Sequence, residues 1–148
     1  MKNLAFFLPI LFVTGIFCKK ENTVNTEQIL VDGNWYHDSY LLDKDGDGVF
    51  TNELFPCQTG DVWKFDANNH FEIRDEIEYC NTDVDSVAII SGLWELQNND
   101  SEIQIVIGLG FEVVQFKIHA INDTLLELRA YNDPGTPYPP EERVILKR

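Results

Sequence analysis

The sequence predicts an all-β domain, an eight-stranded antiparallel up-and-down barrel, and three observations support this. Apolar and polar residues alternate with a period of two over most of the chain after Gly33. Turn-forming residues separate the alternating segments at the spacing expected of hairpins. Outside the N-terminal apolar segment, no stretch of about ten residues has a helical apolar stripe. Short antiparallel strands in this number favour a closed barrel, which has no exposed sheet edges, and a sandwich is the alternative.

The predicted strands follow one another with short connections. Val114, Phe116 and Ile118, for example, alternate with polar residues, as expected for a strand with one buried face. Residues 132–142 contain four of the six prolines and are predicted to form a loop, because proline cannot serve a central strand. The predicted strands are residues 34–42, 61–66, 70–79, 87–97, 102–108, 111–121, 124–131 and 142–147.

The first residues have the layout of an export signal. Lys2 provides a positive charge, and residues 4–17 are almost continuously apolar. This run matches the apolar region of a secretory signal and is shorter than the roughly 20 residues of a membrane-spanning helix. We therefore predict export, with residues 1–18 as a signal peptide, 19–31 as a polar tether and 32–148 as the folded domain.

Cys18 ends the apolar run and is followed by two lysines and a glutamate. This arrangement resembles a bacterial lipoprotein signal, in which the cysteine is lipidated and becomes the mature N-terminus. Phe17 departs from that pattern, which has a small residue before the cysteine. An ordinary cleaved signal is the alternative, although no Ala-x-Ala-like site is present. The resemblance implies a membrane-anchored lipoprotein, periplasmic or on the cell surface, whose membrane partner is reached through the N-terminal lipid.

The net charge of −14 limits the classes of partner. Nucleic acids and anionic membrane surfaces are polyanions, so a strongly acidic domain is not expected to bind them. No protein partner can be named from the sequence. The charge fits a solvated exported domain or one that binds cations.

Cysteine count predicts one disulfide. Three cysteines are an odd number, and if Cys18 carries lipid, Cys57 and Cys80 remain as a pair. They lie nearly symmetrically about a predicted turn at residues 66–70, and a bulge at Gly60 would bring them to the same face. Two free thiols or a metal-binding pair are the alternatives, but no second Cys/His pair is present to complete a zinc site, which favours the disulfide.

An acidic loop at residues 43–48 is the most specific chemical motif. Asp43, Asp45 and Asp47 alternate with other residues and glycine follows, as in the first half of an EF-hand calcium loop. The carbonyl of Val49 would be the next ligand, and Glu53 lies one place short of the closing position. A structural calcium ion is therefore the one cofactor considered, and an acidic surface turn is the alternative.

Gly33-Asn34-Trp35 opens the first predicted strand and resembles the Gly-x-Trp signature at the start of lipocalins, and Gly92-Leu93-Trp94 leads a later strand. With these motifs, the pattern as a whole resembles the lipocalin-like domains of exported Bacteroidetes lipoproteins over about residues 32–131. The resemblance implies an eight-stranded up-and-down barrel and little about function, because barrel folds host many activities.

These features lead to two functional hypotheses. One is a barrel that binds a small apolar ligand inside. The other is a structural or interaction lipoprotein with a filled core and a calcium-stabilised loop. An enzyme is not expected, because no nucleophile elbow, zinc motif or phosphate loop is present. The candidate ligand-lining residues, for which core packing is the alternative role, are Trp35, Trp63, Phe65, Phe71 and Trp94.

Overall fold

The computed structural model describes residues 25–75, 89–108, 112–131 and 141–148, and these form a closed antiparallel barrel. Each strand pairs with the next in the chain, and pairing of the first long strand with the last closes the sheet. The predicted fold class, an eight-stranded up-and-down barrel, is therefore confirmed. The barrel strands are β1 (Asn34–Asp43), β3 (Val62–Phe65), β4 (His70–Arg74), β5 (Ile89–Gln97), β6 (Glu102–Ile107), β7 (Glu112–Ile121), β8 (Leu125–Tyr131) and β9 (Glu141–Lys147).

Three elements differ from the sequence prediction. The tether predicted through residue 31 is corrected, because Thr26–Val31 form a short helix, α1, and Leu30 of this helix is fully buried. A two-residue strand, β2 (Thr51–Asn52), pairs with β1 outside the barrel. Pro56–Gln58 form a 3-10 helix, η1, so Cys57 does not lie on a continuation of β3. Each of these short elements depends on packing or pairing with β1 or its neighbours, which local sequence patterns do not encode.

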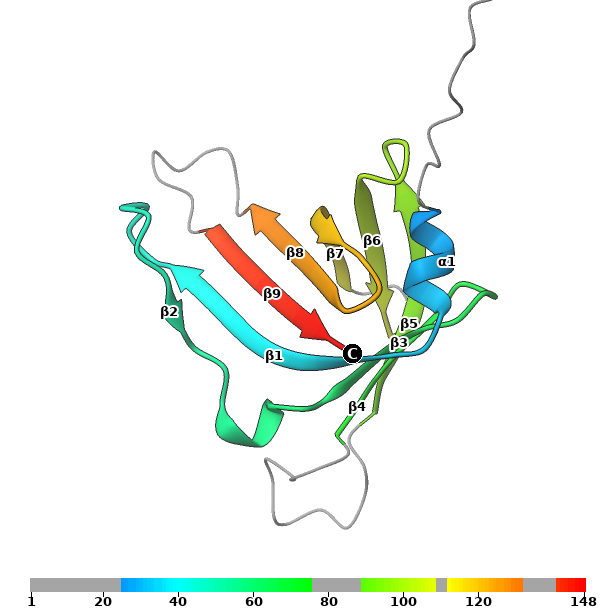
Figure 1. The fold of residues 1–148 in the computed structure, drawn as a ribbon, viewed down its shortest axis with the longest axis horizontal. Coiled ribbons are helices and arrows are strands. Elements are labelled where there is room, and N and C mark those ends of the chain that lie inside the picture. The colour runs from blue at the N-terminus through cyan, green and yellow to red at the C-terminus, as the bar shows by residue number, and fades with distance from the viewer. Residues whose placement is uncertain (1–24, 76–88, 109–111, 132–140) are drawn as a thin grey trace, which may run out of the picture.

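The turns match their predicted chemistry. Asn69 in the β3–β4 turn has φ of 64°, a left-handed conformation that asparagine tolerates better than most residues. Its side-chain amide donates to the carbonyl of Trp94 at 3.0 Å, and its carbonyl accepts from the Trp94 N–H at 2.9 Å. In the β5–β6 turn, residues 98–100 all have positive φ. Figure 1 shows the resulting barrel, with α1 at one end and the C-terminus beside β1.

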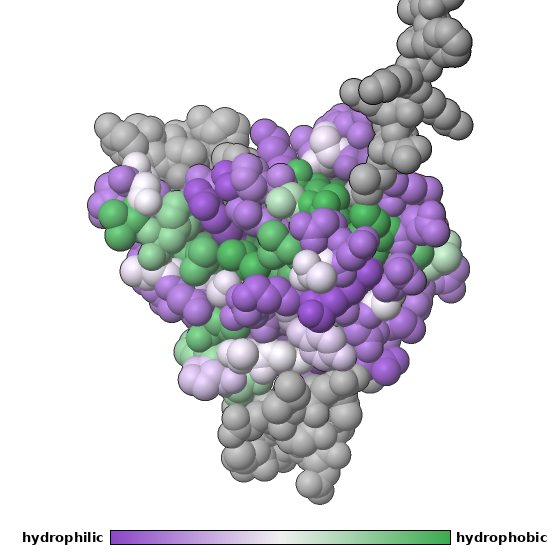
Figure 2. Space-filling view, viewed as in Figure 1, coloured by the Kyte–Doolittle hydropathy of each residue, from purple (hydrophilic) through white to green (hydrophobic). Residues whose placement is uncertain are grey.

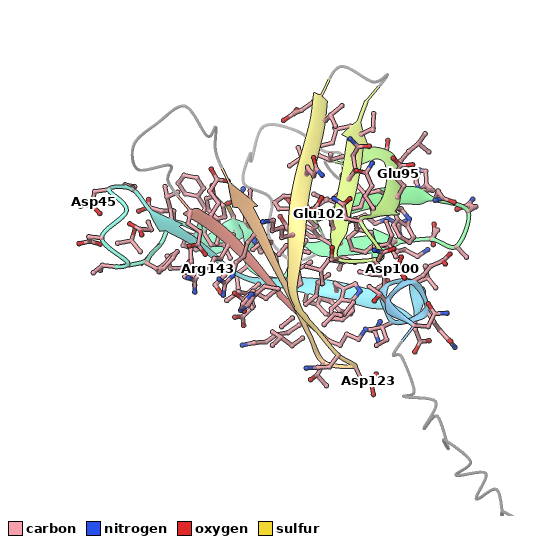
Figure 3. All side chains as sticks on the ribbon, turned by 90° about the horizontal axis from the view of Figure 1, so that it is seen from above. Asp45, Glu95, Asp100, Glu102, Asp123 and Arg143 are labelled. Carbon is pink, nitrogen blue, oxygen red and sulfur yellow. The ribbon has the colours of Figure 1, made fainter. Side chains whose placement is uncertain are left out.

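The two ends of the barrel differ. At the end that we call the helix end, β1 begins, β9 finishes and α1 packs. The opposite end, which we call the mouth, is where β1, β4, β6 and β8 finish. In Figure 3, Asp45 lies at the far side of the molecule from α1, so the acidic loop belongs to the mouth.

The outer surface is mainly polar. Figure 2 shows that on one face an interrupted band of hydrophobic residues crosses the molecule between hydrophilic areas. Within the described residues, no helix is both long and apolar enough to span a membrane.

Candidate ligand-binding site

The five aromatic residues proposed from the sequence all lie in the barrel core. The ring centroids of Phe65 and Phe71 are 5.2 Å apart, and those of Trp63 and Phe71 are 5.6 Å apart. Trp94 meets Phe65 edge-on at 5.6 Å. Trp35 is opposite Trp63 in the β1–β3 register. The structure thus brings these side chains together as a packed aromatic cluster.

The helix end is closed by polar groups as well as by packing. The Trp35 indole N–H donates to the carbonyl of Leu30 at 3.1 Å. The Arg148 guanidinium lies 4.2 Å from the centroid of the Trp35 ring, and it also donates to the carbonyl of Ile29. These contacts join the start of β1, α1 and the C-terminus around Trp35.

Apolar residues of the inner face reach solvent at the mouth. Register places Trp63, Ile73 and Ile90 opposite one another on β3, β4 and β5, and directly opposite residues share a face. Trp63 is buried and Ile73 is half-buried, whereas Ile90 is 44% exposed. The row therefore passes from the packed core to an accessible apolar surface.

Further half-buried apolar residues follow on the inner face. Ile107 is the last residue of β6, and Val114 lies near the start of β7. Both pack against the core cluster and both remain partly exposed. Together with Ile73 and Ile90, they form what we call the mouth surface.

Two carboxyl groups border the mouth surface. Val62 pairs with Arg74, so Asp61 and Asp75 follow at the next opposite positions, on the face of Trp63 and Ile73. Burial, and then the nearby Asp75 carboxylate, raise the pKa of Asp61 from 3.8 to about 6. Asp75 Oδ1 is buried and has no hydrogen-bond partner among the described residues.

Other titratable groups lie on the inner face of β1 and β9. Burial lowers the pKa of His37 from 6.5 to about 4, although the neighbouring Asp38 opposes this change. The His37 ring meets Trp63 edge-on at 5.7 Å, and its Nε2 is buried without a hydrogen-bond partner within the described part of the chain. On β1, burial raises the pKa of Tyr40 to about 12, and the Glu142 carboxylate adds to this effect. The mouth thus combines apolar surface with two carboxyl groups, and the inner face of β1 adds His37 and Tyr40.

The acidic loop brings its three aspartates together. Carboxylate oxygens of Asp43, Asp45 and Asp47 lie within 4.8 Å of one another. The buried Asp43 accepts hydrogen bonds from the backbone N–H groups of Gly46 and Gly48 at 2.8 and 2.9 Å. These bonds organise the loop around Asp43.

Of the remaining two predicted calcium ligands, Glu53 is engaged elsewhere and Val49 adjoins the cluster. Glu53 accepts from Lys44 Nζ at 2.8 Å and from the Thr51 hydroxyl at 2.9 Å, and these bonds, Lys44 first, lower its pKa. Val49 is exposed, and its N–H donates to Asp47 at 2.7 Å. A hollow of about 220 Å³ adjoins the loop and is lined in part by Asp45 and Asp47.

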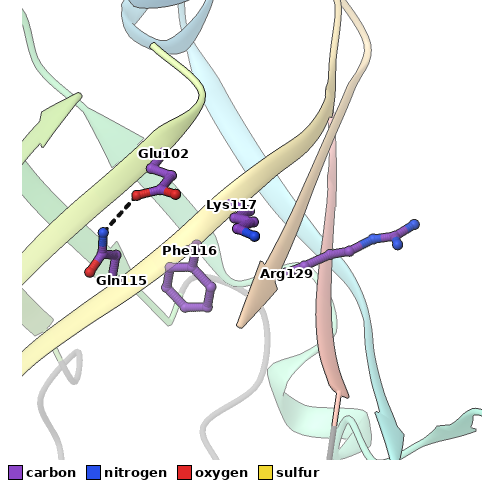
Figure 4. Close-up of a pocket in the computed structure, with 5 residues that line it drawn as sticks. All are labelled: Glu102, Gln115, Phe116, Lys117 and Arg129. Carbon is purple, nitrogen blue, oxygen red and sulfur yellow. Dashed lines mark hydrogen bonds between the residues drawn. The ribbon is translucent and has the colours of Figure 1, made fainter. Parts of the chain in front are cut away.

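Two further hollows are lined mainly by outward-facing residues, together with the core residues Phe116 and Trp94. One, of about 240 Å³, is lined by Glu102, Gln115, Phe116, Lys117 and Arg129, and in Figure 4 the Arg129 side chain extends away from the other four. Gln115 Nε2 donates to Glu102 at 2.8 Å across its floor. The second, of about 320 Å³, includes the exposed Leu93. Both lie on strands whose inward residues are already packed.

Cys57 is not a free thiol. Its predicted partner, Cys80, lies outside the described residues, so the pairing stays a prediction. Cys18 and the predicted signal segment also lie outside them. Gly60, where a bulge was expected, has φ of 91° and follows η1, so this glycine serves a turn before β3.

Sequence reasoning did not single out Asp61, Asp75 or Ile90. Alternation alone could have placed Asp61 with Trp63 and Asp75 with Ile73 on one face. The proximity of Asp61 to Asp75, however, depends on the β3–β4 register, and the raised pKa of Asp61 depends on burial. Neither property is visible in a chain with 25 acidic residues.

Comparison with known proteins finds a structural similarity and no sequence match. No protein-family model matches the chain, and no curated protein matches it by sequence. A bovine odorant-binding protein, solved as a deswapped triple mutant, is similar in structure with a TM-score of 0.41 and 13% sequence identity. The alignment covers 78% of this chain and 72% of that one.

Proposed function

We propose that this protein is an exported, lipid-anchored, lipocalin-like barrel that binds a small apolar ligand at its mouth and is not an enzyme. The main observation in support is the exposure of Ile90, an inward-facing residue in register with Ile73 and Trp63. Exposed apolar surface costs free energy in water, and a ligand that covers it recovers about 25 cal/mol for each Å² buried. Binding at the mouth leaves the packed aromatic cluster in place, so those five residues support the site from below.

Two substitutions on β5 test this proposal. Ile90 faces inward, whereas Leu93 faces outward and is 59% exposed. Replacing Ile90 with asparagine should weaken binding of the neutral fluorescent probe N-phenyl-1-naphthylamine by about tenfold or more, because a buried isoleucine contributes roughly 1.5–3 kcal/mol. Leu93→Asn changes a similar residue on the outer face and should bind the probe as the native protein does.

Fluorescence titration of the purified protein supplies the measurement. Absence of probe binding to the native protein would contradict the proposal. Equal loss in both variants would point to general destabilisation, which thermal melting of each variant detects. Loss in Leu93→Asn alone would move the ligand to the outer hollow beside Trp94 and would also contradict a site at the mouth.

A calcium-stabilised loop on a filled barrel is the second candidate function. It is favoured by the convergence of Asp43, Asp45 and Asp47, because clustered carboxylate oxygens suit a hard cation. Calcium at millimolar concentration should then raise the melting temperature relative to a chelator, since a ligand of the folded state stabilises it. Asp45→Asn should abolish this rise, and Asp123→Asn, in the β7–β8 turn, should retain it. An unchanged melting temperature of the native protein would contradict this candidate.

A further inference from the structure

We propose that the ligand carries an ammonium group beside its apolar part, and that Asp61 and Asp75 bind this group. This inference rests on the proposed function, since it defines the chemical class of the same ligand. It follows from three features of the mouth: the position of the two carboxyl groups, the absence of a cation paired with them in the described part of the chain, and the apolar surface beside them.

The position of the pair follows from strand register. Trp63 and Ile73 are directly opposite each other, and Asp61 and Asp75 stand two residues further along the same face toward the mouth. Ile90 pairs with Ile73 on the next strand. A ligand lying over Ile73 and Ile90 would therefore have its end close to the two carboxyl groups.

Among the described residues, no cation balances the charges of this pair. None of the ion pairs among the described residues involves Asp61 or Asp75. The nearest cationic residue in sequence, Arg74, is held by Glu72 at 2.8 Å on the other face of β4. Asp75 Oδ1 is buried and lacks a hydrogen-bond donor among these residues. A buried, unpaired acceptor is costly, and a donor with positive charge relieves both the missing bond and the repulsion.

The chemistry of the pair selects among apolar ligands. An anionic head such as a fatty-acid carboxylate would add a third negative charge to the site, within a protein of net charge −14. A hydroxyl head would supply a hydrogen bond and leave the two charges unbalanced. An ammonium head supplies up to three donors and the opposite charge, and charge-assisted hydrogen bonds are the stronger kind.

Competition against N-phenyl-1-naphthylamine at pH 7.5 tests this choice with three matched compounds, decylammonium, decanol and decanoate. The two charged compounds are kept below their micelle concentrations, and decanol is kept below its solubility limit. Decylammonium should displace the probe at a concentration about tenfold or more below that of decanol, because hydrogen bonds to charged groups exceed neutral ones by this order. Decanoate should be the weakest competitor. The Asp61→Asn and Asp75→Asn variants should each lower the affinity for decylammonium by a larger factor than the affinity for decanol, and so reduce the preference.

Asp123→Asn provides the control for loss of one negative charge. Asp123 is exposed in the turn at residues 122–124, which contacts the C-terminus through the Thr124 carbonyl at the helix end. This variant should retain the native preference. If decanol competes and decylammonium is not preferred, the inference is overturned and the proposed function stands. If none of the three competes and the probe does not bind, the proposed function itself fails.

Discussion

At the scale of single residues, His37 shows how the barrel interior controls protonation. Its ring lies on the inner face of β1 against Trp63, and Nε2 has no described partner. Burial disfavours the imidazolium, which would have to give up its water, and this lowers the pKa of His37 to about 4. The folded protein therefore keeps His37 neutral at pH values at which the unfolded chain protonates it.

A dependence of stability on pH follows from this difference. Between about pH 6.5 and pH 4, His37 is protonated in the unfolded state and neutral in the folded state. Because the unfolded state binds the extra proton, the free energy of unfolding decreases as the pH falls through this window. Replacing His37 with phenylalanine keeps a ring against Trp63 and should make the loss smaller. Urea unfolding of both proteins between pH 7 and 4 measures it, and parallel curves for the two would contradict the prediction.

Asp61 acts in the opposite direction over part of that range. Its raised pKa means that the folded state binds more protons between about pH 4 and 6, so this group favours folding at the acid end. The His37 effect must therefore be taken from the difference between variant and native protein. His119→Gln, a substitution of an exposed histidine on β7, is the matched control for loss of an imidazole.

At the scale of elements, the contact between β5 and β6 depends on a glycine. A Cβ atom added to Gly92 would stand 2.0 Å from the carbonyl oxygen of Val106 on β6. Real contacts of this kind do not occur, and both groups belong to paired backbone, so the strands would have to separate. Gly92 is thus required by close approach of two strands and not by a turn.

Gly92→Ala should therefore lower the free energy of unfolding by about 1–3 kcal/mol, the usual cost of forcing added volume into a packed region. Ser91→Ala, at the adjacent exposed position, should change it by less than about 0.5 kcal/mol. Denaturant unfolding of the two variants makes the comparison. Equal stability of Gly92→Ala and the native protein would show that the strands accommodate the methyl group.

The helix α1 is a second element whose existence depends on its contacts. Six residues are too few for a stable isolated helix. Asn25 caps it by accepting the Gln28 N–H at 3.2 Å, and Leu30 is fully buried in the core. The helix thus closes the barrel end beside Trp35 and Arg148, and it forms because the barrel offers a surface for Leu30.

At the scale of the whole molecule, the proposed lipid anchor determines where the barrel works. Metabolic labelling with a palmitate analogue should label the native protein, and Cys18→Ser should lose the label, because acylation there requires the thiol. Cys57→Ser, which removes a different cysteine, should keep it. An unlabelled native protein, recovered in soluble form after export, would contradict anchoring and favour an ordinary cleaved signal.

The strand framework was predictable from the sequence for a simple physical reason. Strands with one buried face record their two-residue period in the chain, and turns with positive φ select asparagine and glycine. Predicted and observed bounds agree within about two residues for most strands, as for residues 102–108 against Glu102–Ile107. The exception is the strand predicted over residues 70–79, because β4 ends at Arg74 and Asp75 lies outside it. Clustering of Asp43, Asp45 and Asp47 was also visible, because all three belong to one short loop.

Tertiary structure alone decided which polar groups meet inside the barrel. A bulge between His37 and Ser39 shifts the alternation of β1, so that Tyr40 faces inward where strict alternation from Trp35 would turn it outward. A second bulge, between Ile118 and Ala120, shifts the register of β7. The approach of Asp61 to Asp75 depends on pairing between strands. The sequence by itself determined the strands and turns, because alternation is local, whereas closure of the barrel depended on pairing of β1 with β9. It could not determine the mouth, because register, bulges and burial arise only when distant strands pair.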